Sequence, residues 1–414
     1  MGREVTLAGW LYYKRTHGRV WFLIVRDGLN HIQCVVSESE VRDAVFQACG
    51  LLERETPISV TGQVNRDERA PGGYEIRICD LTVIRSVKKY PVKESDSVAR
   101  LFDRRHLTLR FDRQQAIQMV RSQVVQACHT FFCKKGYIYV DPPLLMPAGG
   151  PDDKIFDMNY FGQKAFLCRQ HPFYMTAAAG ALGRVYSIQP VLQKENRISA
   201  DRLTEFRMVE VCSMHMDLDS VISLAEALVL AVIQAVLKKG TELTALRKDL
   251  SPIKNIARPF QKVMLEELAP GPSARIADKK GMEDFTSSEL SAMARKYRDP
   301  FIIRGLPDPV KRFYLKTAQD GSHSLGFYLI LPGPMGKVIT GGEYEDNCDT
   351  LRDKLRRQHF SADHEKQILE LCHYIPPSFA GFRLCIEKMT AWICGLSHIR
   401  DASLFPRMRH RLHP

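Results

Sequence analysis

Five short strand patterns, with one helical stretch after the third, fill residues 1–88. The second strand pattern, residues 20–25, is an apolar run that ends at the turn pair Asp27-Gly28. In the third, the apolar residues Ile32, Cys34 and Val36 alternate along the strand. The helical stretch lies near residues 38–52, before the fourth strand. Five strands with a helix after the third fit a small closed barrel of the oligonucleotide-binding (OB) type. We therefore predict a five-stranded β-barrel of the nucleic-acid-binding type over residues 1–88.

The rest of the chain mixes helices and strands. Residues 89–110 are polar and charged and are predicted to be a linker, and residues 111–414 predict an α+β domain with a largely antiparallel sheet flanked by helices. Within that domain, residues 240–300 are irregular and charged and are interpreted as an insertion. Helices are predicted at 114–135, 218–239 and 384–395, and strands at 138–140, 183–190, 206–216, 301–303, 312–316, 327–331 and 337–340.

The chain is basic, with 59 Lys and Arg against 47 Asp and Glu and a net charge of +12. Such a charge favours a polyanionic partner, nucleic acid first, although a generic basic surface gives the same number. In the barrel, Lys14 and Arg15 are interleaved with Tyr12, Tyr13 and Phe22. Cations beside aromatic rings suit single-stranded RNA, whereas the same rings would equally serve to fill the barrel.

Three features argue against a membrane or secreted protein. The longest apolar stretch, residues 224–237, contains Glu226 and Gln234 and therefore predicts a buried helix and not a membrane span. The first residues lack the apolar core of a secretory signal. The 11 Cys are odd in number and form no CxxC pair, which favours reduced thiols, a cytoplasmic location and no structural zinc site.

A series of motifs runs along nearly the whole chain in a specific order and spacing. The motifs are residues 3–10, 156–162, 185–190, 202–210, 311–316, 341–343 and 395–407. Together they resemble the class II aminoacyl-tRNA synthetases of the aspartate/asparagine/lysine branch, and within it the asparaginyl-tRNA synthetases most closely. The resemblance implies an OB barrel joined to a class II synthetase-like core, with an antiparallel sheet of six to seven strands flanked by helices, and a homodimer.

The nucleotide-binding motifs 2 and 3 of that family are degenerate in this chain. The resemblance places the Arg for the α-phosphate at Gln193 and the Arg for the γ-phosphate at Lys388. Asp201 stands where the motif 2 loop has a phosphate-binding cation, and Arg202 would compensate only through a change of register. Arg383 replaces a glycine that lets the backbone approach the nucleotide. Because charge developing on phosphate requires fixed cations, we interpret the chain as a diverged paralogue.

The metal and amino-acid positions have changed as well. Tyr328 and Lys337 stand where the resemblance places the acidic ligands of Mg²⁺, and an ammonium group cannot coordinate a metal, so no metal site is predicted. Tyr344 replaces the Arg that holds the substrate side chain, and Ala148 replaces the Glu that receives the substrate ammonium group. Lys337 would itself neutralise a triphosphate, so metal-free nucleotide binding stays open.

The predicted pocket residues fall into three roles. The catalytic candidates are Lys337, Tyr344, Lys388, Gln193 and His171, and the cofactor-binding candidates are Glu195, Phe206, Arg202 and Arg383. The substrate-binding candidates are Arg169, Gln170, Glu205, Glu210, Tyr328 and Glu343. Core packing and buried ion pairs on the strands explain several of these residues equally well. A Cys168–His171 nucleophile pair and an acid/base site at His323 are further alternatives.

Three functions follow from this site. The first is an enzyme of amino-acid-derived small-molecule metabolism, which has lost standard tRNA charging and uses the rebuilt pocket. The second is a non-catalytic factor that binds RNA, including tRNA, or protein through the basic barrel. The third is a residual ATP-dependent ligase for asparagine or aspartate. ATP is the cofactor only in the third case, and no membrane is expected as a partner in any of them.

Overall fold

The computed structural model describes residues 2–147, 155–168, 172–195, 198–238, 240–247, 249–268, 292–294, 296–307, 313–357 and 362–414. The chain divides into two compact units, Met1–Thr108 and Leu109–Pro414. Each unit has a hydrophobic core of its own. The two are described separately below.

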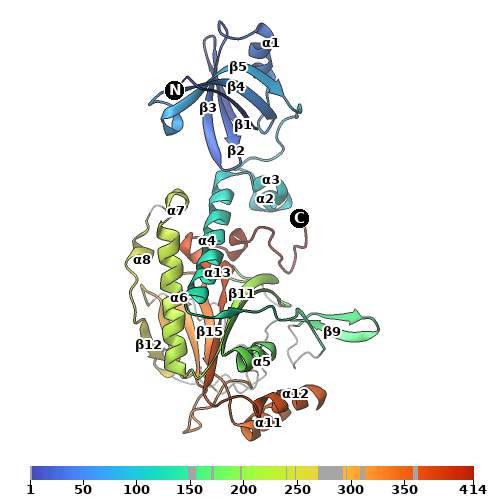
Figure 1. Cartoon of the computed structure of the whole chain (residues 1–414), viewed down its shortest axis with the longest axis vertical. Helices are drawn as coiled ribbons and strands as arrows, with labels where there is room; N and C mark the ends of the chain where they lie inside the picture. The colour runs from blue at the N-terminus through green and yellow to red at the C-terminus, as the bar shows by residue number, and fades with distance from the viewer. Residues whose placement is uncertain are drawn as a thin grey trace. The chain divides into compact units, whose positions relative to one another are not determined.

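The first unit is the predicted five-stranded closed barrel (Figure 1). Its strands are β1 (Glu4–His17), β2 (Val20–Asp27), β3 (Asn30–Ser37), β4 (Pro57–Arg66) and β5 (Tyr74–Val83), in the order β1-β2-β3-β5-β4. Helix α1 (Asp43–Leu51) follows the third strand, as the sequence predicts. Alternate residues point inward along each strand, and Leu11, Leu23 and Ile58 are fully buried. This part of the fold prediction is confirmed.

Two short helices occupy the segment predicted as a linker. These are α2 (Val98–Asp103) and α3 (Arg105–Thr108). Ser97 caps α2 by accepting a hydrogen bond from the backbone NH of Arg100, which satisfies one of the unpaired donors at the helix start. The polar composition of residues 89–110 therefore gave no indication of these two helices.

The second unit is built on an eight-stranded sheet of order β12-β13-β14-β15-β16-β11-β10-β6. Its strands are β6 (Ile138–Tyr139), β10 (Arg184–Leu192), β11 (Glu205–Met214), β12 (Gln261–Met264), β13 (Phe301–Arg304), β14 (Gly326–Leu331), β15 (Gly336–Glu343) and β16 (Phe379–Cys385). All neighbours are antiparallel except β6–β10 and β12–β13, which are parallel at the two edges. A separate small sheet contains β7 (Leu145–Met146), β8 (Asp157–Tyr160) and β9 (Gln163–Leu167). The α+β class is confirmed.

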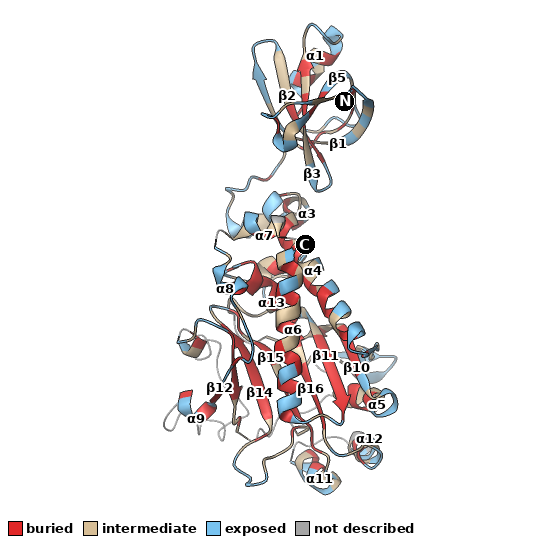
Figure 2. Ribbon diagram, turned by 60° about the vertical axis from the view of Figure 1, so that its left-hand side comes forward, coloured by how far each residue is buried: buried red, intermediate tan, exposed pale blue. Residues whose placement is uncertain are grey.

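Helices α4 (Asp112–Lys134), α6 (Leu218–Lys238) and α13 (Ile386–Ile393) contribute to one large core against the sheet (Figure 2). Helix α6 is the one described helix long and apolar enough to span a membrane by composition. In the fold it lies along the sheet, with Val221, Ala225 and Val232 fully buried, as expected for a core helix. The other helices are α5 (Pro172–Leu182), α7 (Thr241–Leu246), α8 (Ser251–Lys254), α9 (Leu265–Leu268), α11 (Cys348–Arg356) and α12 (Ala362–Cys372).

Three local predictions need correction. The helix predicted at 384–395 begins only at Ile386, because the preceding residues form the central strand β16. That strand is buried on both faces, so its apolar residues do not alternate and resemble a buried helix. Within the strand predicted at 312–316, Arg312 lies outside the described residues, and the remainder forms only a bridge between Leu315 and Tyr344. The predicted insertion contributes strand β12 to the sheet edge.

One pair of cysteines contradicts the prediction of reduced thiols. Cys348 at the start of α11 and Cys372 at the end of α12 form a disulfide, with their Cα atoms 5.8 Å apart. The two residues are 24 apart in sequence, and the α11–α12 helical hairpin brings them together. Sequence spacing carries no sign of such a contact. The other nine cysteines are free.

Candidate functional site

The candidate site lies on the face of the sheet opposite helices α4 and α6. Arg383 on β16 lies between Phe382 and Leu384, both of which belong to the core beneath the helices. Since successive side chains on a strand point to opposite faces, Arg383 points to the other face. Glu210 on β11, between the core residues Val209 and Val211, does the same.

Strand register aligns several candidates in one row across this face. Glu210 is paired with Arg383, Arg383 with Thr340, and Thr340 with Tyr328. Four predicted or neighbouring residues, from strands β11, β14, β15 and β16, are therefore adjacent. The row sets a carboxylate, a guanidinium, a hydroxyl and a phenol side by side across the middle of the sheet.

Glu195 is held by two partners within the chain. Gln193, which is buried after the end of β10, donates from Nε2 to Glu195 Oε1 at 2.8 Å. Arg202 donates from its guanidinium to Glu195 Oε2, also at 2.8 Å. The two cofactor-binding candidates therefore form an ion pair with each other. A phosphate would have to compete with a carboxylate for the Arg202 guanidinium.

Lys388 is also paired internally. Its Nζ lies 3.0 Å from Asp201 Oδ2, and the two side chains are only 15% and 11% exposed. The hydroxyl of Ser199 donates to the other Asp201 oxygen at 2.7 Å. The position assigned to a phosphate-binding cation therefore has a carboxylate that cancels the charge of the neighbouring lysine. A largely buried pair of this kind carries no net charge toward an anion.

The residues at the predicted metal positions do not fit Mg²⁺. Tyr328 is fully buried, and the Lys337 ammonium lies 4.2 Å from the centre of its ring, in a cation–π contact. Neither side chain offers a carboxylate oxygen, which Mg²⁺ requires. In the described part of the chain, no group of three or more His, Cys, Asp or Glu residues is arranged to hold a metal ion.

Tyr344 stands at the position that the resemblance assigns to a substrate-binding arginine. It is buried and packs edge-on against Tyr314 and Phe379, with ring centres 5.4 Å apart in each case. The Tyr344 hydroxyl lies close to Gly381, and a Cβ atom added to Gly381 would lie only 2.5 Å from that oxygen. Burial raises the pKa of Tyr344 well above its usual value, so the side chain is a neutral phenol. An apolar ring thus replaces a cation.

Two adjoining cavities lie around Tyr344. A small one, of about 10 Å³, is bordered by Glu210, Arg383 and Tyr344. A larger one, of about 50 Å³, shares Pro172, Tyr314 and Tyr344 with it and extends beneath α11 and α12. We call the larger one the apolar chamber, and its walls include Phe173, Phe313, Leu351, Ile368, Ile375 and Phe379. No single sequence motif indicates this chamber, because its walls come from segments that lie far apart in the chain.

Three other candidates lie in structural contacts. Glu343 is buried, accepts a hydrogen bond from the backbone NH of Leu218 at the start of α6, and pairs with Lys316. Phe206 is partly buried and packs against the main core. Glu205 lies exposed at the start of β11. Their predicted roles in cofactor and substrate binding stay predictions.

The remaining predicted residues lie outside this constellation. Arg169, Gln170, His171 and Ala148 are outside the described residues, so the proposed Cys168–His171 pair stays a prediction. His323 lies on an exposed turn, where its Nδ1 is 2.7 Å from the hydroxyl of Ser322.

Comparisons with known proteins agree with the fold and the motif series. Residues 97–409 match the family described as tRNA synthetases class II (D, K and N), and residues 5–84 match the OB-fold nucleic acid binding domain. The asparagine–tRNA ligase of Pelotomaculum thermopropionicum is 33% identical over 417 residues, covering 100% of this chain and 97% of that protein. That of Sorangium cellulosum is 34% identical over 431 residues, with the same coverage of 100% and 97%.

Solved structures give the same assignment. The asparaginyl-tRNA synthetase from Pyrococcus horikoshii, in complex with asparaginyl-adenylate, matches with a TM-score of 0.93 and 30% identity, covering 100% of this chain and 96% of that one. The Entamoeba histolytica enzyme, at 20% identity and a TM-score of 0.88, covers 100% of this chain and 97% of that one and agrees in fold. The predicted resemblance is confirmed, and the chain belongs to the class II tRNA synthetase family of the D, K and N group.

Proposed function

We propose that this chain no longer forms an aminoacyl-adenylate from ATP and asparagine and instead acts on another amino-acid-derived small molecule in the rebuilt pocket. The observation that carries the proposal is the Lys388–Asp201 ion pair, which cancels charge where a nucleotide phosphate would need it. The Glu195–Arg202 ion pair likewise compensates a positive charge that a phosphate would otherwise bind. Loss of a single donor to a transition state typically slows a reaction about 10²–10³-fold, and several positions have changed here.

The test is ATP–pyrophosphate exchange with asparagine and with aspartate. The Pelotomaculum thermopropionicum ligase, assayed in parallel, serves as the positive control. We expect exchange at least about 10³-fold slower than in the control, from the changed phosphate contacts. Exchange within tenfold of the control would contradict the proposal and support the residual ligase, with ATP as its cofactor.

A second measurement separates failure to bind ATP from failure to react. Because a ligand that binds only the folded state stabilises it, Mg·ATP should raise the melting temperature of the control enzyme. We expect no such shift for this chain. A variant that combines Gln193→Arg, Asp201→Asn and Lys388→Arg restores two guanidinium groups and removes the competing carboxylate. It is expected to gain stabilisation by Mg·ATP, if folding is unchanged by circular dichroism.

RNA binding by the barrel is a second candidate function. Tyr13 is 58% exposed, and the Arg15 guanidinium lies 4.7 Å from the centre of the Phe22 ring. Exposed rings beside cations provide a stacking surface for single-stranded nucleic acid. Affinity for tRNA that falls steeply with salt would support this function. Equal affinity at low and high salt would contradict it.

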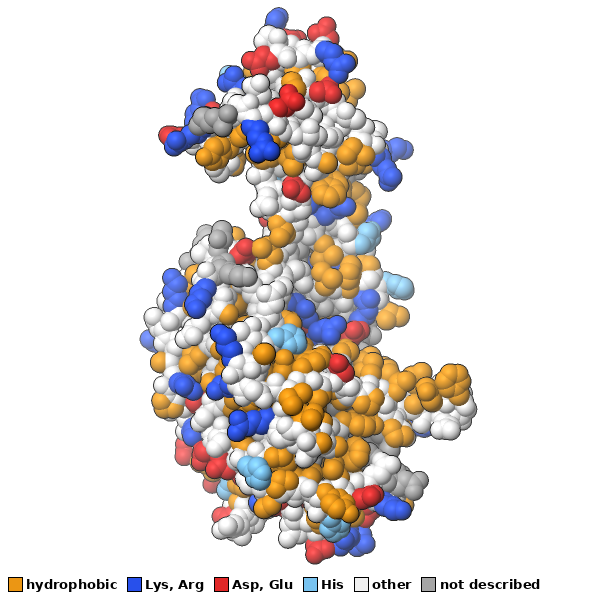
Figure 3. Space-filling model, in the orientation of Figure 1, with side chains coloured by type: hydrophobic (Ala, Val, Ile, Leu, Met, Phe, Trp, Pro, Cys, Tyr) orange, Lys and Arg blue, Asp and Glu red, His pale blue; other side chains and the backbone are white. Residues whose placement is uncertain are grey.

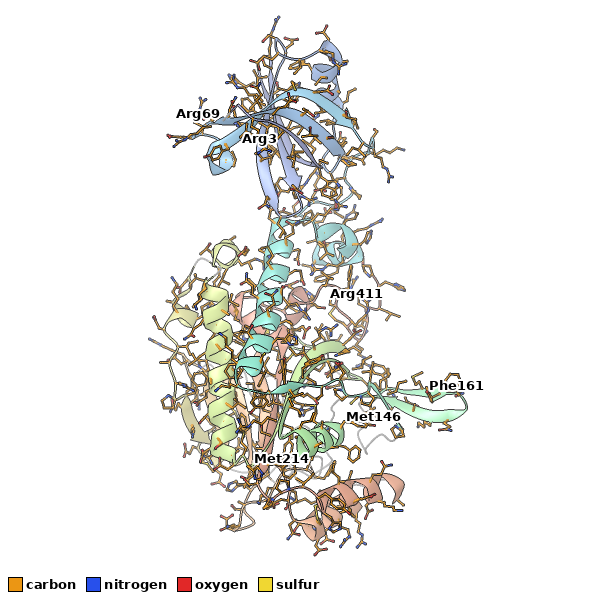
Figure 4. The ribbon with its side chains drawn as sticks, viewed as in Figure 1. Arg3, Arg69, Met146, Phe161, Met214 and Arg411 are labelled. Atoms are coloured by element: carbon orange, nitrogen blue, oxygen red, sulfur yellow. A yellow bond between two sulfur atoms is a disulfide. The ribbon has the colours of Figure 1, made fainter. Side chains whose placement is uncertain are left out.

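We also propose that the chain forms a homodimer in a cytosol-like compartment. Hairpin β8–β9 carries exposed apolar side chains, with Phe161 at its tip 92% exposed (Figures 3 and 4). An apolar projection of this kind is typical of a covered surface. Light scattering on the purified chain should give twice the chain mass, and Phe161→Asp should weaken the dimer. A monomer at micromolar concentration would refute this assignment. Nine of the 11 cysteines form no disulfide, which supports the compartment, whereas the Cys348–Cys372 disulfide argues against it.

A further inference from the structure

We propose that the rebuilt pocket binds a small monocarboxylate with a short apolar group, its carboxylate on Arg383 and its apolar group in the apolar chamber. The inference rests on the proposed function and names the class of ligand for that site. A single ligand occupies both of the cavities around Tyr344. Three observations support it. Arg383 has no hydrogen bond or ion pair within the described part of the chain, the apolar chamber is lined mostly by apolar side chains, and the two cavities share three residues in their walls.

Arg383 is a cation with no partner in the part of the chain that the structure describes. Its guanidinium is half-buried, and no hydrogen bond or ion pair of its side chain is found there. Glu210 stands opposite it in register and borders the same small cavity, but no ion pair between the two is found among the described residues. A half-buried guanidinium without a partner is costly, and its planar fork matches a carboxylate through two parallel hydrogen bonds. The site therefore favours an anionic group of this shape.

The apolar chamber accepts a group that needs no hydrogen bonds. The two carboxylates at its edge are already paired, Glu345 with Lys354 and Asp346 with Lys316, each at 2.8 Å. The remaining walls are mostly aromatic and aliphatic side chains. A carboxamide placed here would lose its hydrogen bonds to water without gaining others, so asparagine is a poor ligand. An apolar group gains free energy from the same burial.

The two cavities are close enough for one small ligand. They share Pro172, Tyr314 and Tyr344 in their walls, so the two cavities adjoin at these residues. A volume of about 50 Å³ holds roughly three to five groups the size of a water molecule, at about 10–15 Å³ each. That is the size of a branched alkyl group such as isobutyl. A five- or six-carbon branched carboxylate therefore matches both cavities.

The test measures binding of three probes to the full chain by calorimetry. The probes are 4-methylpentanoate, its neutral analogue 4-methylpentanamide, and acetate. We expect 4-methylpentanoate to bind at least tenfold more tightly than either of the others. Equal affinity for the acid and the amide would overturn the role of Arg383, and equal affinity for 4-methylpentanoate and acetate would overturn the role of the apolar chamber.

Two variants assign the contacts to residues. Arg383→Met should weaken binding of 4-methylpentanoate at least tenfold and remove the preference over the amide, whereas Arg298→Met, on an exposed segment of the same unit, should change neither. Leu371→Trp fills the apolar chamber and should abolish the preference over acetate. If Arg383→Met fails to fold, Arg383→Lys keeps the charge without the fork and should still weaken binding. Unchanged binding in Arg383→Met or Arg383→Lys refutes the inference.

The outcome is separable from that of the proposed function. Fast pyrophosphate exchange with asparagine would refute the proposed function whatever these probes do. Absence of exchange, together with no selectivity for 4-methylpentanoate, would refute this inference alone. Selective binding that depends on Arg383 and on the apolar chamber, without exchange, supports both.

Discussion

Replacing Lys388 by methionine tests the ion pair on which the proposed function depends. The Lys388 ammonium lies 3.0 Å from Asp201, and both side chains are more than four-fifths buried. Removing one partner of a buried pair leaves the other charge without compensation, which typically costs 3–5 kcal/mol. Asp201 keeps its hydrogen bond from Ser199, so we expect the lower end, about 3 kcal/mol. The double variant Lys388→Met/Asp201→Asn should lose less than the sum of the single variants, because no unpaired charge remains.

The assay is urea denaturation followed by tryptophan fluorescence. The chain has three tryptophans, and Trp392 lies on α13, one turn after Lys388, where it is buried. Trp10 and Trp21 lie in the barrel and are replaced by phenylalanine in all variants, so that the signal reports the second unit alone. Midpoints and slopes then give the free energy of unfolding of that unit.

An exposed pair provides the matched control. Lys262 and Asp219 are also 3.0 Å apart, but they are 37% and 62% exposed. Solvent screens such pairs, so Lys262→Met should cost less than about 1 kcal/mol. A coupling energy below about 0.5 kcal/mol between Lys388 and Asp201 is the additive result expected of independent sites, and it would refute the internal pair.

Three other substitutions test the fold around the site. Gly381→Ala should destabilise the second unit by several degrees in melting temperature, because its Cβ atom would lie 2.2 Å from a backbone oxygen. Gly180→Ala should not, because its Cβ atom would make only an ordinary van der Waals contact, 3.8 Å from Ile375. Burial raises the pKa of Glu226, so the folded state favours the protonated carboxyl group. Glu226→Gln should therefore stabilise the protein at pH 7, where the carboxylate is charged. This gain should vanish as the pH falls below 4.5, the ordinary pKa of Glu. Cys348→Ser opens a 24-residue loop and should cost about 3 kcal/mol in urea denaturation under oxidising conditions; an unchanged midpoint would mean that Cys348 and Cys372 are not bonded in solution.

Elements with a regular pattern were predictable from the sequence. Burial alternates along the first half of strand β4, so each side chain there reports which face it occupies. Helix α6 is long and predominantly apolar. Strand β16 was not predictable as a strand, because it is buried on both faces and loses the alternation that identifies a strand. The pairing of β16 with β11 places Arg383 next to Glu210, although the two residues lie far apart in the sequence.

The sequence by itself determined the barrel, the α+β class and the family, because periodicity and motif order are local properties of the chain. Only the tertiary structure decided which charges cancel, which cysteines bond and where an apolar chamber opens. Those features depend on distances between residues such as Asp201 and Lys388, which lie far apart in sequence and meet only when the sheet forms.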